Sequence, residues 1–285
     1  MFWNWGRPAH RAATPADRNA LTTLTRQEQR VHVHLDWRPV EDWLGDTPFE
    51  VVERGQRLLG ALACPSGPPD TAWIRLLAFA NRADAQALWK LLWPPALEQL
   101  RAQRVSVIAA LSIDDWINPL LLSAKFEHTH SVVVLARRSD LPMQPCQHAV
   151  TIRRARVTDH AAIILADTAA FESPWQLTAE MLELAMSAAD YLTVAEMEGR
   201  LVGYQLTTAS ASGGHLGRLA VLPGWQGRGI GAALVANLVA HYQARGAQHI
   251  TVNTQDTNPA SLRLYQRLGF ERTGEAFPVY QRFLL

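Results

Sequence analysis

Residues 219–231, LAVLPGWQGRGIG, join an apolar run to a glycine-rich turn. The run ends before Pro223, and the spacing Gln226-x-x-Gly229-x-Gly231 then opens a helical pattern. Backbone N–H groups at such a helix N-terminus bind anions, because the free N–H groups and the helix dipole both favour negative charge. The residues therefore predict a phosphate-binding loop.

Two other interpretations of this loop are open. Gly227-x-Gly229-x-x-Ala232 also satisfies the dinucleotide-binding fingerprint, and Asp256 follows near the spacing of its ribose-binding acid. However, five residues separate Val221 from Gly227, and the chain beyond Asp256 is too short for a doubly wound sheet. Nicotinamide-dinucleotide binding is therefore a remote alternative, and a plain strand-to-helix turn without a ligand is the other.

The residues after the loop predict a helix, a strand and a second helix. Apolar residues repeat every four positions from Ile230 to Tyr242, which indicates one buried face of a helix over about 230–244. Residues 250–254 have the β-branched character of a strand. Asn258-Pro259 then supplies the N-cap and first residue of a short helix that ends at Gly269.

This order of motifs resembles the GNAT superfamily of N-acetyltransferases. The segment NPASLRLYQRLGF follows QGRGIG after one helix and one strand, as it does in that family. Phe171-x-x-Pro174-Trp175 and the C-terminal block look most like the branch that acetylates the N-terminal alanine of ribosomal proteins. The resemblance covers about residues 150–285 and implies a mixed α/β fold, with helices flanking a sheet that contains a splayed pair of parallel strands.

The resemblance also implies a cosubstrate and its contacts. In that family acetyl-CoA lies in the wedge between the splayed strands, here about 215–221 and 250–254, with its pyrophosphate on the amides of the glycine-rich loop. Asn258 matches the residue that hydrogen-bonds the CoA arm, although its role as an N-cap explains it equally. The residues expected to contact acetyl-CoA are Leu219, Ala220, Val221, Gln226, Gly227, Arg228, Gly229, Ile230, Gly231, Asn253, Asn258 and Ser261.

Two residues are candidates for acid–base catalysis. Tyr265 matches the family's residue whose hydroxyl protonates the departing thiolate, although a core aromatic residue at helical spacing is the alternative. The ribosomal-protein branch has a glutamate base at the position of Asn253, which cannot accept a proton. The histone-acetylating branch has its glutamate where this chain has His215, and an imidazole near pKa 6.5 is a competent base. The alternative for His215 is a solvated histidine at a strand edge that takes no part in catalysis.

The missing carboxylate favours an acceptor amine of low pKa. An α-amine, with a pKa of about 7.7–8.0, is already neutral in part at pH 7.5. A lysine amine, with a pKa of about 10.4, is neutral only to about 0.1% and needs a stronger base. The chain is therefore expected to acetylate a primary amine of a small molecule or a protein α-amine. An acetyl-CoA sensor or scaffold without turnover is the alternative from another class.

The first half repeats the second at the scale of a domain. Residues 56–60, QRLLG, match 199–203, GRLVG, and Phe126-Glu127 matches Phe270-Glu271. Between these anchors the patterns predict the same order, with a strand at 71–79, a helix from 83, a strand at 104–111, a short helix at 115–124 and a strand at 130–137. We therefore expect a tandem protein, with domains at 1–140 and 148–285 and a linker at about 138–148.

The N-terminal copy has lost the residues of the site. Its loop, residues 81–86, has no glycine, and Asp84 would repel a phosphate. The position of the catalytic tyrosine falls near Leu121-Leu122. This copy is therefore predicted to be a degenerate GNAT-like domain, preceded by a flexible arm of about residues 1–14 and a helix that starts near Thr14-Pro15.

Composition excludes several other classes. The 285 residues carry a formal net charge of +1, so no basic face indicates a nucleic acid partner. No apolar stretch approaches the roughly 20 residues that span a bilayer, so no membrane partner is expected.

Cys64 and Cys146 lack metal-ligand spacing and are expected to be free thiols in the cytoplasm. The pairs His32/His34 and His128/His130 are expected on solvated strand faces, without a metal. The chain is expected to be a monomer with paired domains or a homodimer.

Overall fold

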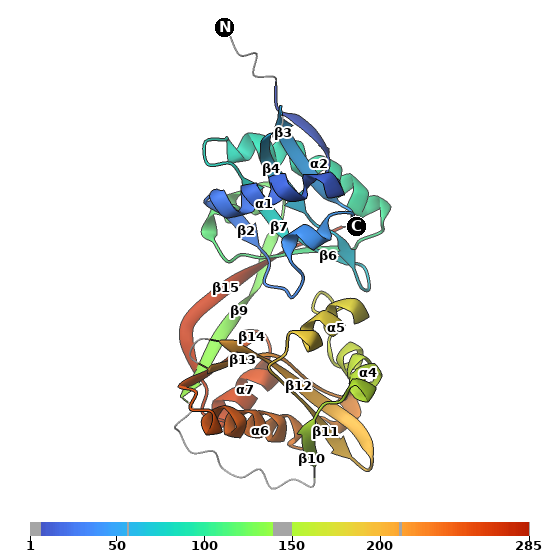
Figure 1. Cartoon of the computed structure of the whole chain (residues 1–285), viewed down its shortest axis with the longest axis vertical. Helices are drawn as coiled ribbons and strands as arrows, with labels where there is room; N and C mark the ends of the chain where they lie inside the picture. Colours follow the sequence, from blue (N-terminus) through green and yellow to red (C-terminus); the bar gives the residue numbers. More distant parts are fainter. Residues whose placement is uncertain (1–6, 56, 139–149, 211–212, 285) are drawn as a thin grey trace. The chain divides into compact units, whose positions relative to one another are not determined.

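A computed structural model describes residues 7–55, 57–138, 150–210 and 213–284. The chain forms two compact units (Figure 1). Unit 1 contains the residues up to Thr129 together with the segment from Pro278, and unit 2 contains His130–Phe277. The last residues of the chain therefore fold with unit 1, not with the C-terminal unit as the sequence led us to expect. The linker expected at about 138–148 lies almost wholly outside the described residues.

Unit 2 is a mixed sheet with helices on both faces. Its strand order is β10-β11-β12-β13-β14-β9-β15. Strands β13 and β14 are parallel, whereas β10-β11, β11-β12, β12-β13 and β14-β9 are antiparallel. In Figure 1, α6 and α7 lie on one side of β12–β14, and α4 and α5 lie on the other. Its elements are β10 (Thr151–Arg154), η4 (Val157–Asp159), α4 (His160–Ala170), α5 (Ala179–Ser187), β11 (Tyr191–Met197), β12 (Arg200–Ser210), β13 (Gly213–Val221), η5 (Pro223–Trp225), α6 (Ile230–Ala244), β14 (His249–Gln255), α7 (Pro259–Arg267), most of β9 (Glu127–Arg138) and the first part of β15 (Glu271–Phe283).

Unit 1 repeats most of this order of elements. A five-stranded sheet has the order β1-β3-β4-β7-β2, and β5, β6, β8 and the end of β15 form a second group of strands. Strand β2 stands where unit 2 has the helix α5. The elements are β1 (Ala9–Ala12), η1 (Pro15–Asp17), α1 (Arg18–Gln27), β2 (Arg30–Val33), η2 (Val40–Trp43), β3 (Phe49–Arg54), β4 (Arg57–Ala63), β5 (Ser66–Gly67), β6 (Thr71–Trp73), β7 (Leu76–Phe79), α2 (Ala85–Ala102), β8 (Val107–Leu111), η3 (Asp115–Ile117) and α3 (Asn118–Ser123).

The duplication extends to one partly buried ion pair in each unit. In unit 1, Arg11 donates two hydrogen bonds to Asp17, of 2.8 and 2.7 Å. In unit 2, Arg153 donates two to Asp159, of 2.7 and 2.9 Å. Each arginine lies on the first strand and each aspartate at the start of the first helix, and each arginine also reaches a glutamate on the neighbouring strand. The same side chains therefore hold the same turn in both units.

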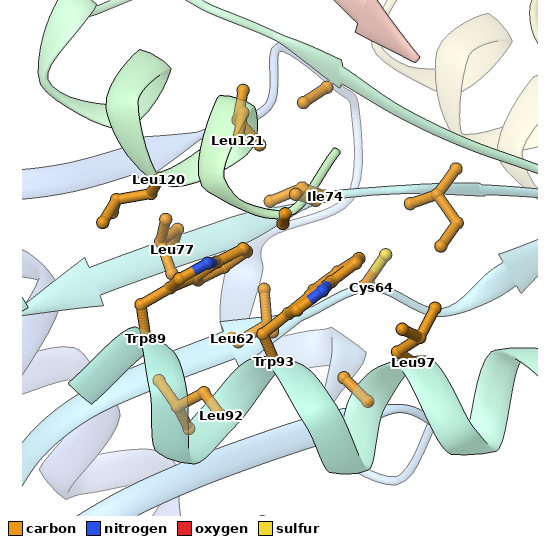
Figure 2. Packing of buried hydrophobic residues seen from close by; sticks show 14 of the residues in the cluster. Leu62, Cys64, Ile74, Leu77, Trp89, Leu92, Trp93, Leu97, Leu120 and Leu121 are labelled. Atoms are coloured by element: carbon orange, nitrogen blue, oxygen red, sulfur yellow. The ribbon is translucent and has the colours of Figure 1, made fainter. Parts of the chain in front are cut away.

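The core of unit 1 lies between α2 and the sheet. Trp89 and Trp93 are one helical turn apart and stack at 5.0 Å between ring centroids (Figure 2). They pack against Leu62, Leu77 and other apolar side chains of the strands. This apolar face of α2 gives unit 1 a core of its own.

Two expectations for unit 1 were wrong. Ala9–Ala12, expected in a flexible arm, form strand β1 and pair with β3, while residues 1–6 lie outside the described part. His32, expected on a solvated face, is only 1% exposed, and burial lowers the pKa of its imidazole to about 4. Both errors arose because each segment pairs with a distant strand, which a four-residue pattern does not reveal.

Candidate functional site

The glycine-rich loop presents backbone N–H groups at the start of α6. Gly227 and Gly229 adopt φ values of 75° and 79°, a left-handed backbone that other residues adopt only with strain. The first helical hydrogen bond runs from the Ala233 N–H to the Gly229 carbonyl at 3.0 Å. The N–H groups from Gly229 to residue 232 therefore have no acceptor within the helix and are available to an anion.

The side chains of the loop are held against the protein. The Gln226 side-chain amide donates to the Val221 carbonyl at 3.1 Å. The Arg228 guanidinium lies 4.7 Å from the ring centroid of Trp225. Gly231 has a packing role, because an added Cβ would lie 3.3 Å from the Leu264 side chain of α7. These contacts orient the Gln226 and Arg228 side chains, both of which are exposed beside the free backbone N–H groups.

A wedge opens between β13 and β14 just before this loop. The parallel pairing of the two strands runs from Gly213 with His249 to Leu216 with Val252 and stops there. The pairing of β12 with β13 shifts register between Leu206, opposite Arg218, and Thr207, opposite Leu216, so that Gly217 forms a bulge. Beyond the bulge, β13 continues to Val221 paired with β12 alone. The splayed strands expected from the resemblance are therefore present at the expected residues.

His215 lies at the narrow end of the wedge, on the face opposite α6. An added Cβ at Gly214 would meet the Tyr242 ring of α6, and Leu216 packs in the same cluster as Tyr242. Because side chains alternate along a strand, His215 points to the other face. Its Nδ1 lies 2.8 Å from the Thr251 Oγ1 of β14. Burial lowers the pKa of His215 below its usual 6.5, so the ring is neutral at neutral pH. The tautomer whose Nδ1–H donates to Thr251 leaves Nε2 free to accept a proton.

Tyr265 lies on the α6 face of the wedge. It packs in the cluster that contains Leu216, Val252 and the apolar side of α6, and its ring centroid lies 5.7 Å from that of Phe270. The residue is 4% exposed, and burial raises the pKa of the phenol above its usual 10. The hydroxyl makes no hydrogen bond within the described part of the chain. Tyr265 is therefore protonated at neutral pH, and its hydroxyl is available to donate a hydrogen bond or a proton to a ligand.

Asn253 and Asn258, both expected to contact acetyl-CoA, lie on β14 and at the start of α7. Asn253 lies on β14 two positions after Thr251, and so on the same face as His215. Asn258 caps α7, and its Oδ1 accepts from the Ser261 N–H at 3.0 Å. The cap uses the oxygen of the Asn258 side-chain amide. The –NH₂ group of that amide has no partner among the described residues.

A family profile and a relative of similar sequence identify the family of this chain. A profile of the Acetyltransferase (GNAT) family matches residues 161–270. An uncharacterized N-acetyltransferase of Methanocaldococcus jannaschii is 31% identical over 130 residues, which are 45% of this chain and 82% of that protein. The chain belongs to the GNAT acetyltransferase family.

A second relative and a solved structure are also similar to this GNAT chain. A mycothiol acetyltransferase of Streptosporangium roseum is 35% identical over 80 residues, which are 26% of this chain and only 24% of that protein. The solved structure of a tandem GNAT protein from the clavulanic acid biosynthesis pathway is 14% identical and has a TM-score of 0.64, with 97% of this chain and 98% of that chain covered. Both halves of the chain therefore share the tandem GNAT fold. The ribosomal-protein branch remains a prediction.

Unit 1 of this GNAT chain has the same wedge, but its own chain fills it. Thr71 pairs with Val107 in parallel, as Gly213 pairs with His249 in unit 2. Beyond that point, however, β2 pairs antiparallel with β7 from Arg30 with Phe79 onward. The strand edge that β13 leaves open in unit 2 is therefore closed in unit 1.

The amides of the degenerate loop in unit 1 also bind side chains of the chain itself. The Asn81 N–H donates to the Glu28 carboxylate at 2.9 Å. At the start of α2, the N–H groups of Gln86 and Ala87 donate to Asp84 at 3.0 and 3.2 Å. Carboxylates of this chain thus occupy the donors that the equivalent loop of unit 2 leaves free.

The structure also shows the surroundings of the other residues that the sequence singled out. Asp256, the carboxylate of the dinucleotide interpretation, accepts from the Ser131 N–H at 3.1 Å. Across the described ranges there is no group of three or more His, Cys, Asp or Glu side chains able to hold a metal ion. Cys64 is a free thiol whose pKa burial raises to about 12, and Cys146 lies outside the described residues. No described helix is long and apolar enough to cross a membrane.

Proposed function

We propose that unit 2 transfers an acetyl group from acetyl-CoA to a primary amine. The observation that carries this proposal is the combination of an open wedge with free N–H groups at its end. The amides from Gly229 onward would bind the pyrophosphate. The unpaired edge of β13 from Gly217 to Val221 would bind the amide-containing arm of CoA through backbone hydrogen bonds, as a neighbouring strand would. The closed wedge of unit 1 supports a single cosubstrate site per chain.

The opposite placement of His215 and Tyr265 suits a direct transfer. The amine nitrogen attacks the thioester carbonyl carbon, so that a C–N bond forms and the C–S bond breaks. The nitrogen loses its proton to Nε2 of His215 on one face of the wedge. The departing sulfur takes a proton from the Tyr265 hydroxyl on the other face. Neutral His215 and protonated Tyr265 are the forms that burial favours at neutral pH.

The proposed acceptor is an amine of low pKa, either a small molecule or a protein α-amine. Among the described residues of this face, Asn253 occupies the position of the carboxylate base, and the imidazole of His215 is a weaker base than such a site would need for lysine. An α-amine with a pKa of about 7.7–8.0 needs little help, whereas a lysine amine has a deficit of about 4 kcal/mol at neutral pH. The net charge of +1 gives no support to a nucleic acid partner.

Release of the CoA thiol from acetyl-CoA, measured with a panel of amines and peptides, tests this function. The proposal predicts release that depends on the acceptor and that favours α-amines over lysine side chains. A sensor or scaffold would bind acetyl-CoA tightly without acceptor-dependent release. That result, with the panel exhausted, would contradict the proposed transfer.

A further inference from the structure

A buried ion pair lies beside the proposed site and no step of the transfer uses it. Arg218 of β13 donates through Nε and Nη2 to the two carboxylate oxygens of Asp167 on α4, at 2.5 and 2.8 Å. The Tyr204 hydroxyl of β12 donates to the same carboxylate at 2.5 Å. All three side chains are buried, with exposures of 8%, 1% and 0%. Such a buried pair contributes little net stability, because desolvation of the charges offsets their attraction.

Arg218 also holds the segment between α4 and α5. Its Nη2 donates to the Trp175 carbonyl at 3.0 Å, and its guanidinium carbon lies 3.7 Å from the ring centroid of Phe171. Within the segment, the Trp175 N–H donates to the Glu172 carbonyl at 2.8 Å and the Gln176 side chain donates to the Phe171 carbonyl at 2.8 Å. One guanidinium therefore binds both ends of the segment Phe171–Trp175, which we call the aromatic loop.

The aromatic loop crosses the open end of the wedge. Arg218 lies three positions after His215 on β13, and its bonds to α4 place it on the His215 face. At the other side, the ring of Trp175 lies 5.9 Å from that of His130 on β9. Strand β14 lies between β13 and β9 in the sheet. A loop that contacts residues of both β13 and β9 therefore passes over the end of β14. This is the face on which an amine would approach the acetyl group.

We propose that Arg218 and Asp167 are positioning residues that fix the aromatic loop as one wall of the acceptor site. The inference rests on the proposed function, since it assigns the loop to the acceptor of that reaction. Arg218 touches neither reacting atom. It joins the strand that would hold acetyl-CoA to the loop that would hold the amine, and so sets the distance between the two substrates.

Arg218→Lys tests the positioning role, because lysine keeps the charge but loses the planar stack on Phe171 and the multiple donors of guanidinium. Misplacement of a bound substrate by about 1 Å can cost up to about 100-fold, so we expect the acceptor KM to rise about 10-fold or more. The KM for acetyl-CoA should stay within twofold. Arg153→Lys is the matched control, because it alters the equivalent ion pair with Asp159 away from the loop.

A second measurement separates this inference from the proposed function. Backbone hydrogen exchange in residues 171–176 should become faster in Arg218→Lys and stay unchanged in Arg153→Lys, whether or not an acceptor is known. If Arg218→Lys fails to fold, Tyr204→Phe, which removes only the third contact to Asp167, should raise exchange there and the acceptor KM about threefold. An unchanged acceptor KM and unchanged exchange in a folded variant would overturn the inference. Faster exchange in Arg218→Lys, together with no acceptor turnover in the wild type, would show that Arg218 fixes the loop but would refute the proposed function, and with it the assignment of the loop to an acceptor.

Discussion

The Glu28 carboxylate accepts a hydrogen bond of 2.9 Å from the Asn81 N–H, in the loop of unit 1 that corresponds to the glycine-rich loop of unit 2. A side chain of the protein thus occupies an anion position in unit 1. Strand β2, which begins two residues later, closes the edge of β7. These contacts explain how one copy of a duplicated fold can be complete without a ligand while the other stays open.

The first prediction is one acetyl-CoA site per chain. Calorimetry should give a stoichiometry of one, and Gly229→Asp should abolish binding, because a carboxylate would stand among the free amides and the left-handed backbone disfavours it. Gly224→Asp is the control, since an added Cβ at Gly224 meets open space. Two sites would contradict the closure of unit 1, and binding that survives Gly229→Asp would contradict the phosphate site at the start of α6.

The second prediction concerns the closure itself. Glu28→Ala should lower the free energy of unfolding of unit 1 by about 1 kcal/mol, because the Asn81 N–H loses its charged acceptor. Arg57→Ala removes only the ion pair with Glu28 from an arginine side chain that is 66% exposed, and should cost about 0.5 kcal/mol or less. Urea denaturation compares the two variants, and equal losses would show that the loop contact adds nothing.

The third prediction is that Tyr265→Phe slows chemistry and spares binding. Removal of a general acid should lower kcat by about 10²–10⁴. The dissociation constant of acetyl-CoA should change little, because the Tyr265 hydroxyl is expected to act on the leaving sulfur. A loss below about threefold in a folded variant would make this hydroxyl structural.

The fourth prediction is a pH profile with two limbs. Burial lowers the pKa of His215 below 6.5, so its neutral, proton-accepting form is lost only as pH falls below that lower value. For an α-amine acceptor, log kcat/KM should rise with pH and level off above about 8, where the amine is neutral. His215→Gln should remove the lower limb, so that the slope at acid pH falls from two towards one. If log kcat/KM has the same slope at acid pH in the wild type and in His215→Gln, His215 is not the base.

The fifth prediction concerns acceptor choice. Asn253→Glu places a carboxylate on the His215 face and should extend the acceptors towards lysine, whose deficit of about 4 kcal/mol requires a base. Asn253→Gln, of the same length without the charge, is the control. Efficient lysine acetylation by the wild type near pH 7 would show that the argument from amine pKa is wrong.

The sequence predicted those parts of unit 2 whose signals are local. The helix from Ile230 to Ala244 and the splayed strands were predicted at their observed positions, because periodicity, the glycines and Asn258-Pro259 mark them. The duplication was visible because two short anchors keep nearly the same offset. The residues expected to contact acetyl-CoA remain predictions, although the loop and wedge place them together.

The parts that the sequence did not predict depend on pairing between distant residues. The pattern RVHV at Arg30–Val33 does not reveal that this strand enters a wedge formed by residues from 71 onward. Arg218 gave one signal, a charge within an apolar strand, but its partner Asp167 lies 51 residues away. The end of β15 pairs with β8 in unit 1, which no local pattern indicates.

Acceptor-dependent release of thiol from acetyl-CoA by the wild type and by Gly229→Asp tests the central claim most directly. The account predicts release with an α-amine acceptor for the wild type, retained by Gly224→Asp and lost in a folded Gly229→Asp variant. Acceptor-dependent release that persists in Gly229→Asp would contradict a reaction at the wedge of unit 2.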